Sequence, residues 1–258
     1  MMTIDLSGKT VLVTGCNSGI GLGISKMMAL AGAHVSGCAL DKEGEDFINE
    51  TKNIGSDALY TSCDVTKAGE LKNLVDATIN KFGRIDVLVS NAGRNMFWGA
   101  EKTTTEEWNR NIELNLAAHW KLAQLCKPQL EKNRGVIIII GSNHAYQSIP
   151  GCFPYNIAKT ALTGLVRSLA IEWGPHIRTV GIAPGFIDTA GNQQWFNSFA
   201  NAEAERQRTI NLHPVKRLGT ADEMGGWCVF LASDYAGFAS GVTYLIDGGR
   251  SALMQDEQ

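Results

Sequence analysis

The sequence predicts an α/β protein with one doubly wound, parallel sheet of about seven strands and helices on both faces. Short aliphatic runs alternate along the chain with segments of helical period. The runs are apolar at successive positions, as in Val136 to Ile140, which is typical of strands buried on both faces. No linker rich in proline, glycine or serine and no internal repeat interrupts this alternation. We therefore expect residues 1–258 to form a single domain.

The predicted elements follow one another in a regular order. Apolar, strand-length runs are found at Thr10–Thr14, Ala33–Cys38, Ala58–Cys63, Val87–Ser90, Gly135–Ile140, Arg178–Ala183 and Thr243–Ile246. Helical spacing of apolar residues lies between them, over Ile20–Ala31, Ala68–Phe82, Thr105–Gln129 and Tyr155–Trp173. Strands joined in this way by helices run parallel in one sheet.

Composition argues against several classes of protein. The formal net charge is −3, which gives no basic surface for nucleic acid. The first residues include Asp5 and lack an export signal, and the longest aliphatic run is far short of the ~20 residues of a membrane span. The six scattered cysteines form no CxxC pair and no zinc-like cluster with histidine. We expect reduced thiols, no metal site and a cytoplasmic protein.

A glycine-rich turn, Thr14 to Gly21, joins the first predicted strand to the first predicted helix. A dinucleotide site needs this order of strand, tight turn and helix N-terminus, whose N–H groups bind phosphate. Gly15 would permit the turn, Gly19 would let a pyrophosphate approach the backbone, and Gly21 would let helix and strand pack closely. An ordinary strand-to-helix turn is the alternative interpretation.

Tyr155 and Lys159 stand four residues apart in a predicted helix, so they share one face. A nearby cation stabilises phenolate over phenol and lowers the pKa of tyrosine from about 10. A phenol tuned in this way can act as a general acid or base near neutral pH. The alternative is a solvated helix face on which the two residues fall by chance.

Further motifs accompany the glycine turn and the Tyr155–Lys159 pair. In chain order they are Asn91-Ala92-Gly93, Asn115, Ser142 (thirteen residues before Tyr155), Pro184-Gly185, Thr189 and Asp247-Gly248-Gly249. Together they resemble the short-chain dehydrogenase/reductase family, whose domain is a Rossmann fold, over nearly the whole chain from Lys9 to Gly249. Ser90 departs from the pattern, because the family often has a second asparagine there.

The resemblance implies hydride transfer between a secondary alcohol, or its ketone, and a nicotinamide cofactor. Tyr155 would take the hydroxyl proton, and Lys159 would lower the tyrosine pKa and bind the nicotinamide ribose. Ser142 would hydrogen-bond the reacting oxygen, and Asn115 would hold a water behind Lys159. Other roles are open for two of them: Ser142 as a strand-end cap, and Asn115 as a helix-interior residue that bonds the backbone.

The family's cofactor contacts fall on residues of the glycine turn, the strand ends and the catalytic helix. They are Gly15, Asn17, Ser18, Gly19, Ile20, Gly21, Asp41, Asp64, Val65, Asn91, Ala92, Gly93, Tyr155, Lys159, Pro184, Gly185, Ile187 and Thr189. Asp64 and Val65 would line the adenine, although an aspartate that caps the next helix is an alternative for Asp64. Ile187 would present its backbone to the carboxamide.

The choice between NAD and NADP depends on charge at the end of the second strand. The family's discriminating positions fall on Ala39, Leu40 and Ser18, and none of these is charged. Asp41 could reach the adenosine ribose, and Lys42 could approach a 2′-phosphate or simply lie on the surface. Because a 2′-phosphate needs cationic partners, we expect NAD rather than NADP.

The resemblance implies a substrate pocket built from three regions, one of which is a lid at about residues 190–213. The predicted substrate contacts are Arg94, Asn95, Ser142, Asn143, His144, Gln147, Tyr155, Phe186 and Trp195. Many are polar, which favours a small polar substrate such as a sugar, sugar acid or polyol over a bulky apolar one. The alternative is that most of them face solvent, and His144 could be structural.

Three function classes follow. The first is an NAD-linked alcohol or sugar dehydrogenase, which we favour. The second is an NADPH-linked carbonyl or 3-oxoacyl-thioester reductase. The third is a non-enzymatic NAD(P)-binding regulator, which would not need Asn115, Ser142, Tyr155 and Lys159 together. The resemblance also implies a homotetramer that packs the fourth and fifth helices and the C-terminal segments. From charge and the lengths of apolar runs we expect no nucleic-acid or membrane partner.

Overall fold

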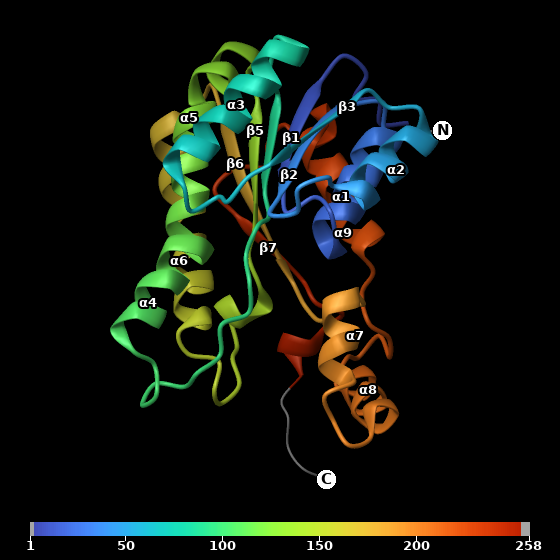
Figure 1. Ribbon diagram of the computed structural model, residues 1–258, viewed down its shortest axis with the longest axis vertical. Helices are drawn as coiled ribbons and strands as arrows, with labels where there is room; N and C mark the ends of the chain where they lie inside the picture. The colour runs from blue at the N-terminus through green and yellow to red at the C-terminus, as the bar shows by residue number, and fades with distance from the viewer. Residues whose placement is uncertain (1–2, 254–258) are drawn as a thin grey trace.

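The structure, a computed structural model, describes residues 3–253 and has the predicted fold class. Seven strands form one parallel sheet in the order β3-β2-β1-β4-β5-β6-β7 (Figure 1). They are β1 (Thr10–Thr14), β2 (His34–Ala39), β3 (Ala58–Ser62), β4 (Val87–Ser90), β5 (Val136–Ile140), β6 (Arg178–Pro184) and β7 (Thr243–Ile246). The order reverses between β1 and β4, and ligands of such sheets bind at the strand ends beside this point.

Helices cover both faces of the sheet (Figure 1). One face packs on α1 (Gly19–Leu30), α2 (Glu45–Ile54) and α9 (Ala221–Ala232), and their apolar side chains share one buried cluster. The other face packs on α3 (Ala68–Phe82), α5 (Ala118–Asn133) and α6 (Tyr155–Trp173), which share a second cluster. The two clusters explain why strands such as β5 are buried along their whole length.

Three helices lie beyond the strand ends, at the bottom of Figure 1. They are α4 (Thr105–Ile112), α7 (Ala190–Phe196) and α8 (Ala202–Asn211), and the last two fall within the predicted lid. Short 3-10 helices follow at η2 (Asn143–Ala145), η3 (Asp234–Ala236) and η4 (Arg250–Ala252). Helices α4, α7 and α8 thus lie around the end of the sheet where ligands are expected, outside the two apolar clusters.

The prediction of one helix over Thr105–Gln129 was wrong in detail. A π-helical turn, η1 (Glu113–Ala117), separates α4 from α5, and α5 continues to Asn133. The sequence had also not indicated α2, α7, α8 or α9. For α9 a signal was present, because Thr220 and Glu223 form a capping box that marks its first turn.

Helices α1 and α9 pack almost backbone to backbone. A Cβ added at Gly23 would lie 2.6 Å from the Ala221 Cβ, and one added at Gly225 would lie 2.6 Å from the Gly23 carbonyl oxygen. Glycine at these two positions is therefore required by the close approach of the helices. The helix that follows the glycine turn is in this way fixed to α9.

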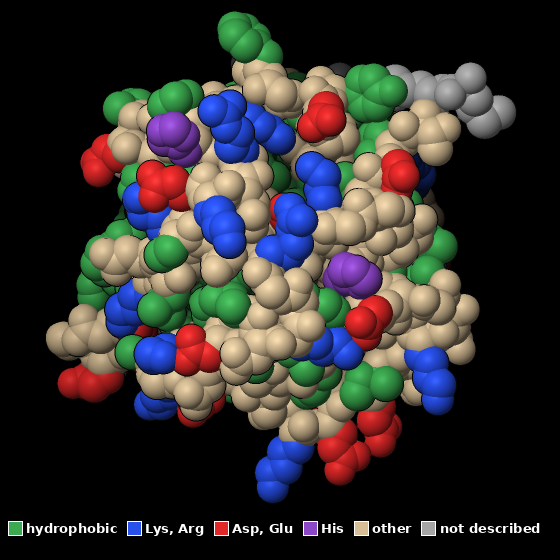
Figure 2. All heavy atoms as spheres, turned by 90° about the horizontal axis from the view of Figure 1, so that it is seen from above, with side chains coloured by type: hydrophobic (Ala, Val, Ile, Leu, Met, Phe, Trp, Pro, Cys, Tyr) green, Lys and Arg blue, Asp and Glu red, His purple; other side chains and the backbone are tan. Residues whose placement is uncertain are grey.

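The surface carries mixed charge. On the face in Figure 2, several lysine and arginine side chains gather near the centre, and acidic and apolar side chains lie around them. Within residues 3–253, no helix has both the length and the apolar character needed to cross a membrane.

Candidate active site

The glycine turn forms a cradle at the end of β1. Gly15 and Gly19 have φ angles of 67° and 51°, in the left-handed region that glycine tolerates best. A Cβ added at Gly21 would lie only 1.9 Å from the carbonyl oxygen of Gly15, so the first turn of α1 lies directly on the loop. The N–H groups at the start of α1 thus border a space into which no side chain of these glycines projects, as phosphate binding requires.

Thr14 and Asn91 hold the two central strands together beside this cradle. The Thr14 hydroxyl oxygen accepts hydrogen bonds from the backbone N–H groups of Asn91 and Ala92, each at 2.9 Å. The Asn91 side chain donates to the carbonyl of Thr14 at 2.8 Å. Sequence reasoning treated Thr14 only as the start of the turn, whereas the structure makes it the joint between β1 and β4.

A cavity of about 700 Å³ extends from the glycine turn to Tyr155 and Lys159. Most of the predicted cofactor contacts line it, namely Gly15, Ser18, Gly19, Ile20, Gly21, Asp41, Asp64, Val65, Asn91, Ala92, Gly93, Tyr155, Lys159, Gly185, Ile187 and Thr189. Arg94 is the one predicted substrate contact, apart from Tyr155, that joins them there. The structure therefore brings together residues that are up to 174 positions apart in the chain, from Gly15 to Thr189.

Asn17 is an exception among the predicted cofactor contacts. Its side chain donates to Asp41 at 3.1 Å and accepts from the backbone N–H of Phe47, so it links the turn to the start of α2. Asp64 lines the cavity, and its carboxylate accepts from the Thr66 N–H and hydroxyl in the turn before α3. It does not cap that helix, because the N-cap position of α3 is Lys67 and has no side-chain cap. Leu40, at a position that can read the 2′-phosphate, is 75% exposed.

Asn115 sits in the π-helical turn and is fully buried. Its carbonyl oxygen accepts from the Arg94 N–H at 3.0 Å, and its NH2 group donates to the Arg94 carbonyl and to Asn111. Asn111 in turn donates to the carbonyl of Pro154, directly before Tyr155. This chain of bonds ties the loop after β4 to the start of α6. Asn115 thus bonds backbone groups, as its alternative role supposed, although they belong to Arg94 and not to its own helix. Its place in a π-helical turn is typical of functional sites.

Lys159 is almost completely buried, and burial lowers its pKa to about 8. Its ammonium donates to the carbonyl of Ile140 at 3.1 Å and lies 5.6 Å from the centre of the Tyr155 ring. Gly93 lies against both polar groups, because a Cβ there would be 2.8 Å from the Asn115 oxygen and 3.4 Å from the Lys159 nitrogen. Only glycine at position 93 leaves room for the Asn115 and Lys159 side chains.

The pKa of Tyr155 shifts opposite to the sequence-based expectation. Burial raises it to about 12, while the neighbouring Ser142 hydroxyl acts in the lowering direction. Burial is the largest influence on this pKa, and the tyrosine is only 7% exposed. The phenol is accordingly protonated at neutral pH.

Aromatic side chains enclose Tyr155 on the substrate side. Phe97 and His144 contact it edge to face, with ring centroids 5.3 Å and 6.0 Å away, and they also contact each other. Ser142 lies at the end of β5, where its hydroxyl accepts from the His144 N–H at 3.1 Å and so caps η2. Burial lowers the pKa of His144, which favours the neutral ring. Sequence reasoning placed Phe97 in a pocket region but did not assign it a contact.

Comparisons with known proteins agree with this geometry. A family model described as enoyl-(acyl carrier protein) reductase matches residues 15–251. Dehydrogenase/reductase SDR family member 4 of Homo sapiens is 34% identical over 249 residues, which covers 95% of this chain and 88% of the human protein. The chain belongs to the short-chain dehydrogenase/reductase family.

Two other relatives extend the comparison within this family. An uncharacterized oxidoreductase of Thermotoga maritima is 34% identical over 258 residues, covering 98% of this chain and all of that protein. The solved structure of a 7α-hydroxysteroid dehydrogenase, complexed with NADH and 7-oxo glycochenodeoxycholic acid, has a TM-score of 0.88 and 33% identity. That likeness covers 96% of each chain.

The residues present fit the nicotinamide dinucleotide, NAD(H) or NADP(H), that the short-chain dehydrogenase/reductase family binds. The glycine turn offers N–H donors where phosphates need them, and glycines at 15, 19 and 93 keep the cavity wall free of side chains. Lys159 and Tyr155 line the same cavity. The cavity volume lies within the range of about 300–1,000 Å³ usual for ligand sites.

The departure from the family pattern at Ser90 has a local partner. The buried Ser90 hydroxyl lies 2.7 Å from Nδ1 of His119 on α5, and burial lowers the His119 pKa to about 3. A neutral histidine thus completes the hydrogen bonding of the serine beneath the cavity. Sequence reasoning had not connected these two residues.

Several predicted contacts do not line the main cavity. Pro184, Asn95, Ser142, Asn143, His144, Gln147, Phe186 and Trp195 all lie outside its lining. Asn95 and Gln147 are exposed, which agrees with the alternative that polar side chains here face solvent. Phe186 instead borders a second, mainly apolar cavity of about 530 Å³ and packs on Trp195 in the lid.

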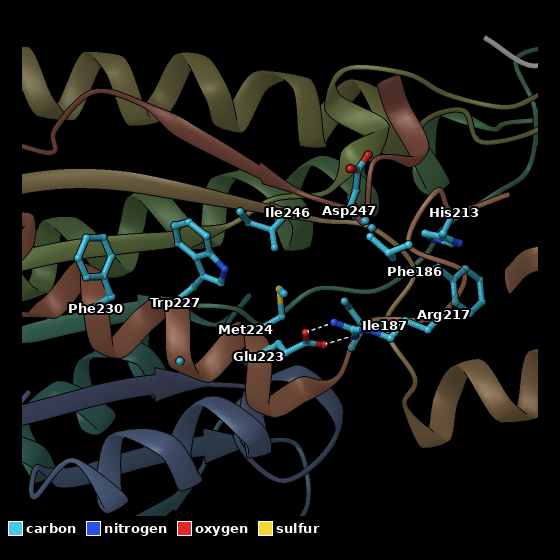
Figure 3. A pocket seen from close by; sticks show the side chains of 15 residues that line it. Phe186, Ile187, His213, Arg217, Glu223, Met224, Trp227, Phe230, Ile246 and Asp247 are labelled. Atoms are coloured by element: carbon cyan, nitrogen blue, oxygen red, sulfur yellow. Dashed lines mark hydrogen bonds and ion pairs between the residues drawn. The ribbon is translucent and has the colours of Figure 1, made fainter. Parts of the chain in front are cut away.

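This second cavity lies between β7 and α9 (Figure 3). Met224 and Trp227 of α9 point toward Ile246 of β7, and the paired Arg217 and Glu223 lie at its edge. Gly185 and Ile187 line both cavities, so one loop separates the two spaces.

Proposed function

We propose that this protein transfers a hydride between NAD and a secondary alcohol or its ketone. The observation that carries the proposal is the convergence of buried Tyr155 and Lys159 on the cavity that begins at the glycine turn. A general acid and a dinucleotide cradle in one cavity are the two parts that this reaction needs.

Tyr155, Ser142 and Lys159 would each have a separate role in the reaction. A bound nicotinamide would supply the position that gives or accepts the hydride. Tyr155, protonated at neutral pH, would donate its phenolic proton to the oxygen of a ketone, or as phenolate would take a proton from an alcohol. Ser142 would hydrogen-bond the same oxygen and stabilise its developing charge. Lys159 is protonated below its pKa of about 8, and its positive charge would stabilise the phenolate.

Replacement of Tyr155 by phenylalanine tests this assignment. We expect turnover to fall by about 10²- to 10⁴-fold, the usual contribution of a positioned acid or base, with dinucleotide affinity unchanged. Turnover equal to the parent enzyme would rule out the tyrosine. If a broad panel of alcohols and ketones gave no turnover in the parent protein while NAD(H) bound tightly, a non-enzymatic regulator would replace the proposal.

The preference for NAD rests on the end of β2. Leu40 is exposed and apolar where a cation would be needed, and the Asp41 carboxylate borders the cavity nearby. A carboxylate repels a 2′-phosphate and can bond the ribose hydroxyls. The NADH in the related 7α-hydroxysteroid dehydrogenase structure is consistent with this preference. A kcat/KM that is higher with NADP than with NAD would favour the NADPH-linked carbonyl or 3-oxoacyl-thioester reductase instead.

Two substrate classes are supported by different observations. Arg94 lines the same cavity as Tyr155 and Lys159, which supports a small polar substrate such as a sugar, sugar acid or polyol. The rings of Phe97 and His144 beside Tyr155 support a substrate with an apolar group next to its carbinol. A panel of polyols, sugar acids and apolar ketones decides between them, and activity confined to apolar ketones would reject the polar class.

A homotetramer is part of the proposal. Exposed apolar side chains on α5 and α6 (Trp120 and Ile171, 44% and 80% exposed) and on β7 (Leu245, 38%) support packing through these elements. Light scattering coupled to size exclusion measures the mass directly. A monomer mass near 27.9 kDa would reject the tetramer.

A further inference from the structure

We propose that Arg206 is a positioning residue that fastens the lid helix α8 to the loop Ile187–Thr189, which borders the cofactor cavity. The inference rests on the proposed dinucleotide site and adds a residue to it. Arg206 of α8 donates to the Asp188 carboxylate at 2.7 Å, across 18 positions of the chain. Ile187 and Thr189, on either side of Asp188, both line the cavity. The ion pair thus joins the lid to a cavity wall.

Asp188 is held from two further directions. Its backbone N–H donates to the Gly219 carbonyl at 2.8 Å, and Ile187 forms an isolated parallel bridge with Gly219. The Gln193 side chain of α7 donates to the same carboxylate. The loop is therefore anchored to the segment before α9 through its backbone, while its one acidic side chain points to the lid helices.

Arg206 also contacts α7. Its guanidinium carbon lies 5.8 Å from the centre of the Phe196 ring, which is 1% exposed. Phe196 packs on Phe186 and on Trp195, with centroids 5.2 Å from each. A cation over a buried ring is attracted to its face, and it is less hydrated there than in water. One guanidinium thus connects the cavity loop, α7 and α8.

The ion pair is partly shielded from solvent, with 29% and 34% of the two side chains exposed. Arginine suits this place better than lysine, because one nitrogen of its planar guanidinium bonds the carboxylate while its face lies on an aromatic ring. A ligand that orders Ile187–Thr189 would therefore also order α8, and an ordered α8 would favour ligand binding by the same factor. Cofactor binding and lid closure are linked through Arg206.

The test compares variants of two arginines on one helix. Arg206→Gln removes the link to the loop. Arg208→Gln is the matched control, because Arg208 pairs only with Glu205 of the same helix among the residues described, and its side chain is 60% exposed. Arg206→Lys keeps the charge without the fork. Chymotrypsin cleavage at the lid aromatics Trp195 and Phe199 is followed with and without saturating NADH, and NADH affinity is measured by fluorescence titration.

We expect Arg206→Gln to be cleaved faster than Arg208→Gln without ligand, and to lose most of the protection that NADH gives the parent protein. Its NADH Kd should rise about fivefold, the lower end of typical coupling between linked sites. Arg206→Lys should recover part of both effects, and Arg208→Gln should match the parent. Asp188→Asn removes the negative charge of the same ion pair and should reproduce both effects of Arg206→Gln. It replaces Arg206→Gln in the test if that variant does not fold.

Equal cleavage of Arg206→Gln and Arg208→Gln without ligand, with equal NADH affinity, would overturn the inference. If the parent protein bound neither NADH nor NADPH, the proposed function would fail instead. The ligand-free cleavage rates would still decide whether Arg206 fastens the lid.

Discussion

Replacing Lys159 with methionine should make the protein more stable while it removes the proposed chemistry. The ammonium of Lys159 is buried, and its pKa falls from an ordinary 10.5 to about 8. At about 1.36 kcal/mol per pKa unit, this shift destabilises the folded state by about 3 kcal/mol at pH 7. Loss of the hydrogen bond to the Ile140 carbonyl would offset about 1 kcal/mol of any gain. The net gain on replacement is about 2 kcal/mol.

The effect depends on pH in a defined direction. Because the folded-state pKa of Lys159 is depressed, the unfolded state binds more protons between pH values of about 8 and 10.5, and stability rises with pH in that window. The destabilisation by about 3 kcal/mol at pH 7 should fall below about 1 kcal/mol at pH 10, where the folded amine is already neutral. The advantage of Lys159→Met should therefore nearly vanish at pH 10.

Thermal melting at fixed protein concentration, at pH 7 and pH 10, measures this directly. A net gain of about 2 kcal/mol corresponds to a Tm increase of roughly 4–8 °C at pH 7 for a chain of this size. A Tm below that of the parent at pH 7 would refute the reasoning, as would an equal difference at both pH values. The parallel assay should show lost turnover, which would make Lys159 a residue kept for function at the expense of stability.

Three further outcomes are expected. Asn115→Ala should lower the free energy of unfolding by about 3 kcal/mol in urea, because it removes the three hydrogen bonds of a fully buried side chain. A decrease below about 1 kcal/mol would contradict this. Gly21→Ala should reduce dinucleotide affinity at least about tenfold in a titration, because its Cβ would displace the Gly15 carbonyl. The control Gly69→Ala, which has open space around its Cβ, should bind the dinucleotide as the parent does. Leu40→Arg should raise kcat/KM for NADP about tenfold by pairing with the 2′-phosphate, and an unchanged NADP value would place the phosphate elsewhere.

The strands and the Tyr155–Lys159 pair could be predicted from the sequence, because both depend on the spacing of residues along the chain. All seven strands were placed to within one residue at each end because strands buried on both faces form uninterrupted apolar runs. Tyr155 and Lys159 were expected in one site because residues four apart share a helix face, and they do line one cavity.

What depends on tertiary packing could not be predicted from the sequence. The π-helical turn around Asn115 leaves no signature in apolar spacing, and α8 is so polar that Thr209 is its one buried residue. The Tyr155 pKa was expected to be lowered by Lys159 and is instead raised, because the folded chain buries the phenol, with the rings of Phe97 and His144 packed against it. Depth of burial is a property of the assembled fold.

The contact between α1 and α9 decides which parts of the molecule can move. With Gly23 and Gly225 leaving no space between the two backbones, the glycine turn, α1 and α9 must shift as one block or not at all. That block would lie beneath the phosphates of a bound dinucleotide, so we expect any opening of the site to come from α7 and α8. Ligands would then enter and leave on the side of α7 and α8, and we expect movement of these two helices to set the rates of binding and release.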